Sequence, residues 1–345
     1  MKFRTLKSVI KSIIISVIIY LVASFVIVML LYEGIFSRVE KYEYNSFISY
    51  EDMVDYSPRE ITFNSRGFEI NGVIYENSDS TDIVILGHTK GGNGEDMLSE
   101  AKFFLDNGYS AMVFDYVGCG NSGGSSQVGL QQPVYNFNDA ISFASSEGYE
   151  HIYLFGSGVG GYAASACSNR EEVVAVVAVS AFSSISDITL EYATSNMGIL
   201  GYLEYPVMLL YQYLIYGGDI FKDAVFGINE SNVPIVIING TSDEVVLSEG
   251  AALINAKQKI TNPNVTYKII ENGKHSSLLR SESANAFLEQ FNNEAYELYN
   301  EYGGNVPKAD IDELYARYSR EEMSELNLSI MNEILDIFNS ARSVS

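Results

Sequence analysis

The stretch Gly156-Ser157-Gly158-Val159-Gly160 decides the fold that we expect for this chain. The mostly apolar run before it predicts a short buried strand, and the small residues after it predict a helix. Glycines two places before and two places after Gly158 allow the backbones of strand and helix to come into close contact. The sequence therefore predicts a sharp strand-to-helix turn with Gly158 at its tip.

This spacing is that of the G-x-S-x-G turn, whose central serine is a nucleophile held at the end of a strand. Gly158 occupies the position of that serine, so the attacking side chain is absent. If Ser157 were the nucleophile instead, Phe155 and Val159 would stand where the turn requires small residues. Glycine also adopts the strained backbone angles of this position more easily than any other residue. We therefore interpret Gly158 as a vacated nucleophile position.

The N-terminal segment predicts a membrane anchor. Residues 13–32 contain no charged side chain, and twenty helical residues at about 1.5 Å each span roughly 30 Å of hydrocarbon. Because Lys2, Arg4, Lys7 and Lys11 precede this stretch, the positive-inside rule predicts a single-pass protein with a cytoplasmic N-terminus and an extracytoplasmic main domain. A cleaved signal peptide and a buried core helix are the alternatives. The apolar stretch is long for a signal, and no convincing small-x-small cleavage site follows it.

Composition excludes several classes of partner and site. The formal net charge is −23, and the acidity lies after residue 40, because residues 1–40 carry five basic and two acidic side chains. Such an acidic domain is not expected to bind nucleic acid or an anionic membrane surface. The spacing of Cys119 and Cys167 does not decide whether they pair, and the chain has no C-x-x-C motif or histidine cluster. We therefore expect neither a metal site nor a cofactor.

The order of the predicted elements indicates an α/β fold. Two alternating segments form a hairpin, and further strands then alternate with helices, which predicts a mostly parallel sheet between helical layers. The predicted strands cover residues 59–64, 68–76, 82–87, 110–114, 151–155, 173–179, 234–239 and 265–271, and the predicted helices cover residues 94–105, 134–146, 161–166 and 281–299.

One long insertion interrupts this alternation. It is apolar, helical in pattern and rich in tyrosine, and we expect it to cover the site as a cap. A second membrane span at residues 199–216 is an alternative that Glu204, Pro206 and Gln212 disfavour. The predicted domains are the N-terminus with its anchor (1–32), a linker (33–58), a core in two parts (59–183 and 232–302), the cap (184–231) and a tail of two helices that packs on the core or binds a partner (303–345).

Loops after the predicted strands complete the pattern. Residues 87–92 begin Gly-His-Thr-Lys, residues 114–124 contain an aspartate and a glycine-rich loop, and Asp243 and His275 each follow a late strand. Together with the turn at Gly158, these motifs make residues 59–300 similar to the α/β-hydrolase superfamily. Within it the chain resembles the capped branch that includes serine-aminopeptidase-like, prolyl-oligopeptidase-like and monoacylglycerol-lipase-like enzymes. The resemblance implies a central, mostly parallel sheet with a helical cap over the site.

The resemblance also implies roles for single residues. His275 matches the catalytic histidine of the family, and Asp243 matches the acid that orients it. The backbone N–H groups of Lys90 and Val159 match the two donors of the oxyanion hole. Thr89 replaces the usual glycine of the first loop.

Cys119 stands where the family has a histidine in the loop at residues 114–124. A substitute nucleophile at Cys119 is an alternative, which the position of this loop after a different strand argues against. The loop is interpreted as a marker of the fold.

Three functional hypotheses follow. The first is a membrane-tethered pseudoenzyme whose capped pocket binds a small molecule or a peptide. The second is slow hydrolysis of an ester or amide by a water that His275 activates as general base. The third is another His-Asp chemistry without a serine nucleophile, as some cofactor-free relatives of this fold perform. A protein partner is not identified by the sequence.

Overall fold

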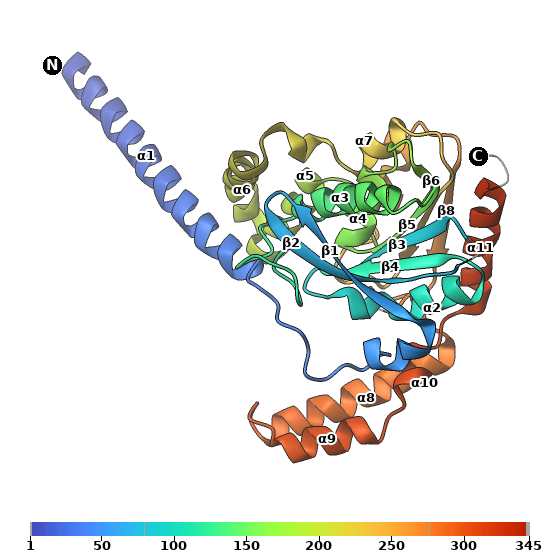
Figure 1. Ribbon diagram of the computed structural model, residues 1–345. Coiled ribbons are helices and arrows are strands. Elements are labelled where there is room, and N and C mark those ends of the chain that lie inside the picture. Colours follow the sequence, from blue (N-terminus) through green and yellow to red (C-terminus); the bar gives the residue numbers. More distant parts are fainter. Residues whose placement is uncertain (1, 79, 276, 343–345) are drawn as a thin grey trace.

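The computed structural model describes residues 2–78, 80–275 and 277–342. An eight-stranded mixed sheet forms its centre, with the strand order β1-β2-β4-β3-β5-β6-β7-β8 (Figure 1). The first pairs, β1 with β2 and β2 with β4, are antiparallel, and all later pairs are parallel. The strands are β1 (Pro58–Ser65), β2 (Phe68–Tyr75), β3 (Asp82–Gly87), β4 (Ser110–Phe114), β5 (His151–Ser157), β6 (Val173–Val179), β7 (Ile235–Gly240) and β8 (Val265–Ile270). This arrangement confirms the predicted α/β class and its mostly parallel sheet.

The predicted hairpin is present at the start of the sheet. The turn between β1 and β2 consists of Arg66 and Gly67, both with positive φ, of 51° and 89°. Two residues with positive φ form the kind of turn that matches the twist of paired strands. The Asn64 side chain accepts a hydrogen bond from the Gly67 N–H at 3.0 Å and holds this turn.

Helices cover both faces of the sheet because its central strands are buried on both sides. One face packs against α3 (Gln132–Ser146) and α4 (Val159–Ala166). The other packs against α2 (Leu98–Asp106), which follows the short turn Gly94–Met97, and against α11 (Leu328–Arg342). The rings of Phe104 and Phe338 stack at 5.3 Å between these last two helices.

The C-terminal region differs from a simple tail of two helices. Its described residues, up to Arg342, contain three helices, namely α9 (Lys308–Ala316), α10 (Arg320–Ser324) and α11. Helix α11 buries Ile330, Ile334 and Phe338, spaced four residues apart on one side of the helix, against the sheet. Helix α8 (Glu282–Glu301) and α9 project from the body as a separate pair (Figure 1) and share their own small apolar cluster.

The insertion forms two long helices and a short one. These are α5 (Ile185–Met197), α6 (Gly201–Tyr216) and α7 (Ala224–Asn229), with a single turn, Gly198–Leu200, between the first two. A Cβ at Gly201 would lie 2.4 Å from the carbonyl oxygen of Ala193, so the close packing of α6 on α5 requires glycine there. Further short turns of helix are Tyr50–Tyr56, Gly217–Phe221 and Leu253–Lys259.

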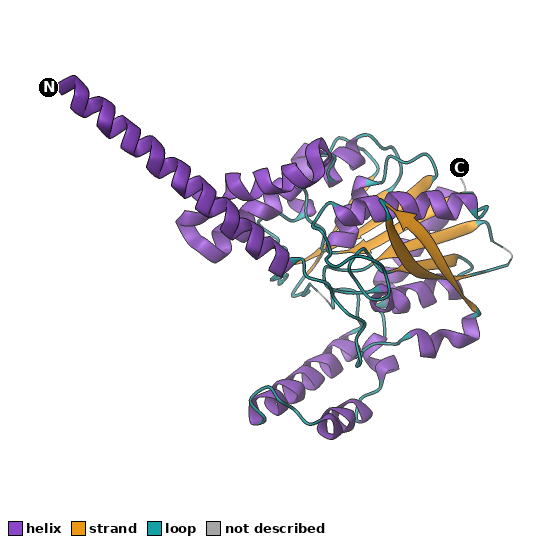
Figure 2. Cartoon of the chain, turned by 60° about the vertical axis from the view of Figure 1, so that its left-hand side comes forward, coloured by secondary structure: helices purple, strands orange, loops and turns teal. Residues whose placement is uncertain are grey.

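Helix α1 (Lys2–Ile35) projects away from the body (Figures 1 and 2) and begins before and ends after the predicted apolar span. It is the one helix in the described part of the chain that is long and apolar enough to cross a membrane. Only 11% of its most apolar 18-residue window is buried. The alternative of a buried core helix is therefore wrong for this segment.

Candidate functional site

The predicted turn joins strand β5 to helix α4. Gly158 lies between them with φ 57° and ψ −119°, angles that residues with a side chain rarely adopt. A Cβ at Gly156 would lie 2.2 Å from the backbone of Gly160, and a Cβ at Gly160 would lie 2.3 Å from the carbonyl oxygen of Gly87. Both flanking glycines are therefore required by close approach of backbones, as in a nucleophile elbow.

A side chain at position 158 would point at His275. A Cβ built there would lie 3.2 Å from His275 Nε2 and 3.4 Å from Thr89 Cγ2. Ser157 belongs to β5, where it pairs with Val179, and no hydrogen bond joins it to His275 among the described residues. The residue at the tip of the turn, beside His275, is thus Gly158 and not Ser157.

His275 and Asp243 form a hydrogen-bonded pair beside this position. His275 Nδ1 lies 2.9 Å from Oδ1 and 3.0 Å from Oδ2 of Asp243, which follows β7, while His275 follows β8. An ionised carboxylate only accepts hydrogen bonds, so Nδ1 carries the proton and Nε2 of the neutral ring is left as an acceptor. That nitrogen faces the Gly158 position.

The environment of Asp243 keeps it ionised. Its side chain is fully buried, and it accepts hydrogen bonds from the N–H groups of Val245 and Val246 at 3.0 and 2.9 Å. Burial by itself raises the pKa of this carboxyl group, but the hydrogen bonds from His275 and the Val246 N–H outweigh it, so the pKa lies below its usual value. A buried, ionised acid of this kind orients the imidazole and stabilises its protonated form.

The two expected oxyanion donors lie on the same side of the sheet. Lys90 and Val159 both line the cavity that contains Gly158 and His275. Neither N–H group donates a hydrogen bond to another described residue, and Val159 is the first residue of α4, where helical N–H groups have no partner within the helix.

A cavity of about 610 Å³ lies over the elbow. Its floor contains Gly158 and His275, and its walls are mostly apolar or aromatic. They come from the loops of the core and from helices α1, α5 and α6, and include Tyr32, Ile35, Phe36, Leu130, Phe182, Ile188, Met208 and Val246. The volume is within the range of about 300–1,000 Å³ that small-molecule sites occupy.

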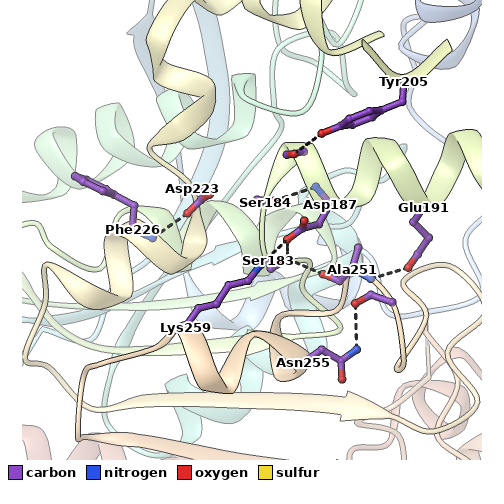
Figure 3. A network of polar contacts seen from close by, with 12 residues as sticks. Ser183, Ser184, Asp187, Glu191, Tyr205, Asp223, Phe226, Ala251, Asn255 and Lys259 are labelled. Atoms are coloured by element: carbon purple, nitrogen blue, oxygen red, sulfur yellow. Dashed lines mark hydrogen bonds and ion pairs between the residues drawn. The ribbon is translucent and has the colours of Figure 1, made fainter. Parts of the chain in front are cut away.

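Polar contacts hold helix α5 of the insertion to residues 247–259 of the core (Figure 3). Glu191 of α5 accepts hydrogen bonds from the N–H groups of Ala251 at 2.6 Å and Leu247 at 3.2 Å. Asp187 accepts a hydrogen bond from Ser183 Oγ at 2.7 Å and lies 3.5 Å from Lys259 Nζ. Since residues 247–251 directly follow the loop of Asp243, these contacts tie α5 to the segment that carries the acid.

Comparison with known proteins identifies the fold of the chain. No family model matches the sequence, and no curated protein matches it. Among solved structures, the esterase Pf2001 from Pyrococcus furiosus is 17% identical, with a TM-score of 0.53 over 77% of this chain and 98% of that one. Est1E from Butyrivibrio proteoclasticus, with ferulic acid bound, is 16% identical, with a TM-score of 0.50 over 63% of this chain and 91% of that one.

The alpha/beta hydrolase GrgF from Penicillium sp. sh18 is also similar in structure, at 16% identity and a TM-score of 0.50 over 70% of this chain and 96% of that one. The chain has the α/β-hydrolase fold. At these identities the similarity establishes the architecture and leaves the chemistry to the residues of the site.

The other motif residues of this α/β-hydrolase fold stabilise the loops around the site. His88 is fully buried, stacks on Tyr116, accepts a hydrogen bond from the Tyr116 N–H at 3.2 Å and contacts the Thr89 carbonyl oxygen at 2.7 Å. Burial lowers the pKa of His88 to about 4. Asp115 accepts hydrogen bonds from the N–H groups of Gly94 and Asn121, both at 2.8 Å. These residues hold the loops around the site and do not line the cavity.

Cys119 and Cys167 are both buried and are not paired with each other. Burial raises the pKa of each thiol to about 12. These raised pKa values favour the protonated thiol at neutral pH, and Cys119 is not among the residues that line the cavity with Gly158 and His275.

The sequence did not indicate that the end of α1 belongs to the site. Tyr32 and Phe36 are buried there, and both line the cavity. The following Arg38 donates hydrogen bonds to the carbonyl oxygens of Ser122 at 2.8 Å and Gly120 at 2.6 Å, in the glycine-rich loop after β4. A single arginine in a polar linker gives no periodic signal, so only the structure connects this segment with the core.

Proposed function

We propose that this chain is a membrane-tethered, hydrolase-like protein whose cavity binds a ligand without covalent serine catalysis. The observation that carries the proposal is the geometry at Gly158. The residue has the backbone angles of a nucleophile, and its absent side chain would face the His275 imidazole. A glycine cannot form an acyl-enzyme, and loss of the serine from such a triad costs about 10⁶ in turnover.

The ligand class follows from the cavity and its donors. The walls are mostly apolar, and the cavity is also lined by Lys90 and Val159, whose N–H groups match the oxyanion donors of the family that the chain resembles. A similar structure, Pf2001, is by name an esterase. An apolar molecule that carries an ester or amide carbonyl group therefore fits this site. Helix α1 is the proposed tether, with the N-terminus on the cytoplasmic side and the main domain outside.

Slow hydrolysis is the second candidate function, and the intact pair of Asp243 and His275 favours it. Nδ1 of His275 is hydrogen-bonded to Asp243, so Nε2 is free to accept a proton from a water molecule beside Gly158. A general base in this position contributes about 10²–10⁴ to a rate. In that case the carbonyl group would be attacked by hydroxide and not by a side chain, and no covalent intermediate would form.

Turnover of p-nitrophenyl butyrate by the full-length chain in detergent micelles distinguishes the two candidates. The ligand-binding proposal predicts the same background rate for the native chain and for His275→Ala. If the native chain hydrolyses the ester above background and His275→Ala does not, the ligand-binding proposal is wrong and water activation by His275 is favoured. Intact-mass measurement in the same samples tests the absence of an acyl-enzyme, which both candidates require.

A further inference from the structure

The cap lies beside the apolar helix α1. We call α5, the turn after it and α6 the cap hairpin (residues 185–216). Its second helix contacts α1 over several turns. Tyr20 OH donates a hydrogen bond to Glu204 Oε1 at 2.9 Å, and the rings of Phe25 and Tyr32 meet the ring of Tyr211 edge-on at 5.7 and 4.9 Å. The ribbon views show α6 next to the part of α1 that joins the body (Figures 1 and 2).

These contacts set the depth that the hairpin reaches along α1. Tyr20 and Tyr32 are twelve residues apart, which corresponds to about 18 Å along a helix. In the proposed topology, residues 13–32 span the hydrocarbon core of the membrane, which is about 30 Å thick. A hairpin that extends from the body to the level of Tyr20 therefore extends to about the middle of the bilayer.

The cap hairpin presents apolar side chains to its surroundings along this length. Ile199 is 82% exposed, and Leu200, Leu203 and Leu214 are exposed by 59%, 60% and 63%. From residue 192 to residue 216 the only charged side chain is Glu204. Exposed apolar surface of this extent marks an interaction site on a protein. Because α1 holds the hairpin alongside the predicted span, the partner is the hydrocarbon of the membrane.

Glu204 has the surroundings that a carboxyl group needs inside a membrane. It accepts hydrogen bonds from the hydroxyl groups of Tyr20 and Ser24, both on α1. Ionisable side chains within a bilayer pair with polar groups of neighbouring helices, because unsatisfied polar atoms are costly in hydrocarbon. The one charged residue of the segment thus faces α1 and not the lipid.

The cavity over the elbow extends to the same pair of helices. Its walls include Tyr32 of α1 and Met208 of α6, and its floor contains Gly158 and His275. A ligand that fills it therefore touches both the vacated nucleophile position and the two helices that contact hydrocarbon.

We propose that the cap hairpin inserts into the extracytoplasmic leaflet beside α1, and that the cavity takes a membrane lipid. The acyl chain lies between α1 and α6, and the ester group lies at Gly158 and His275. This inference rests on the proposed function, because it requires α1 to span the membrane and the cavity to bind a ligand. The strongly acidic domain repels anionic headgroups, so the lipid is uncharged or zwitterionic.

The depth of the hairpin is tested with the full-length chain in phosphatidylcholine nanodiscs. Leu203→Cys, Ile18→Cys and, as a matched exposed control on α8, Tyr296→Cys each carry an environment-sensitive fluorophore. We expect acyl-chain doxyl lipids to quench the labels at positions 203 and 18, and aqueous iodide to quench only the label at 296. Iodide quenching at 203 with lipid quenching at 18 overturns insertion of the hairpin and leaves the tether standing. Iodide quenching at 18 overturns the tether itself.

The lipid site is tested with a phosphatidylcholine that carries a photoreactive acyl chain, followed by peptide mapping. We expect crosslinks to the cavity walls, including the α6 segment around Met208, and loss of the crosslinks near the elbow in Met208→Trp. Lipid quenching at position 203 of the same variant shows that the hairpin still folds and inserts. Crosslinks confined to the outer surface of α1 overturn the lipid site. Stronger crosslinking of the elbow by a phosphatidylglycerol probe overturns the assignment of an uncharged or zwitterionic lipid.

Discussion

Replacing Gly158 by serine returns a hydroxyl group to the elbow and tests whether the rest of the site is in place. A Cβ at this position would lie 3.2 Å from His275 Nε2, so the imidazole must move by a few tenths of an ångström to accommodate it. The serine oxygen is then within hydrogen-bond reach of a base whose other nitrogen is already held by Asp243. We expect Gly158→Ser to form a working Ser-His-Asp arrangement.

The change has a cost in stability and a gain in rate. Gly158 has a φ of 57°, and a side chain held in such a strained conformation costs about 1–3 kcal/mol. We therefore expect the free energy of unfolding to fall by about that amount. A positioned general base contributes about 10²–10⁴ to a rate, so turnover of p-nitrophenyl butyrate should rise by at least roughly 10²-fold over the native chain.

The matched control is Gly158→Ala, which adds the same Cβ and the same backbone strain without a hydroxyl group. Turnover and labelling by a fluorophosphonate reagent are measured in the native chain, in both variants, and in Gly158→Ser combined with His275→Ala. Activity and label are expected only in the single serine variant. If this variant is folded yet as inert as Gly158→Ala, the His275 imidazole and the N–H groups of Lys90 and Val159 are not arranged for catalysis, and the reasoning is refuted.

Three further predictions concern titratable groups. Because the pKa of Asp243 is lowered in the folded state, this carboxylate stabilises the fold above about pH 4, and the stabilisation is lost as the pH falls through the folded-state pKa. The urea midpoint should therefore decline less below pH 4 in Asp243→Asn than in the native chain. An equal decline in the two proteins contradicts this prediction. Burial raises the pKa of Asp96 to about 6, so ionisation of this group destabilises the fold as the pH rises from about 4 to 6. Relative to the native chain, Asp96→Asn should therefore have a higher free energy of unfolding at pH 7 than at pH 5. A difference in unfolding free energy that does not depend on pH refutes the raised pKa of Asp96. Cys119 and Cys167 should resist iodoacetamide at pH 8 in the native chain and react in urea, whereas rapid native alkylation of Cys119 would reopen its role as a nucleophile.

The core of the fold could be predicted because its signals are local. The strands at 82–87, 110–114 and 173–179 have the predicted bounds, since short apolar runs between turns leave little choice of register. The turn at Gly158 could also be predicted from the sequence, because close backbone contacts restrict the residues at positions 156 and 160 to glycine. The pairing of His275 with Asp243 was expected from the family resemblance, and the structure brings the two residues into contact because their loops follow two adjacent parallel strands.

Packing between distant segments could not be predicted. The apolar side of α11 resembles that of any surface helix, and nothing local indicates that it covers the sheet in place of α8. The wall that α1 contributes to the cavity depends on where the linker attaches, which the hydrogen bonds of Arg38 decide. The place of the apolar, tyrosine-rich insertion between two core strands suggested a cap over the site, but the position of the insertion along α1 depends on the pairing of Glu204 with Tyr20.

We propose that the native cavity binds an ester without converting it. The most direct test is equilibrium binding of radiolabelled p-nitrophenyl octanoate to the full-length chain in nanodiscs, with the bound material recovered and analysed after several hours. We expect saturable binding to one site, loss of that binding in the cavity-filling variant Ile188→Trp, and recovery of the ester intact. Recovery of free octanoate, at a rate that requires His275, would contradict it, as would the absence of saturable binding.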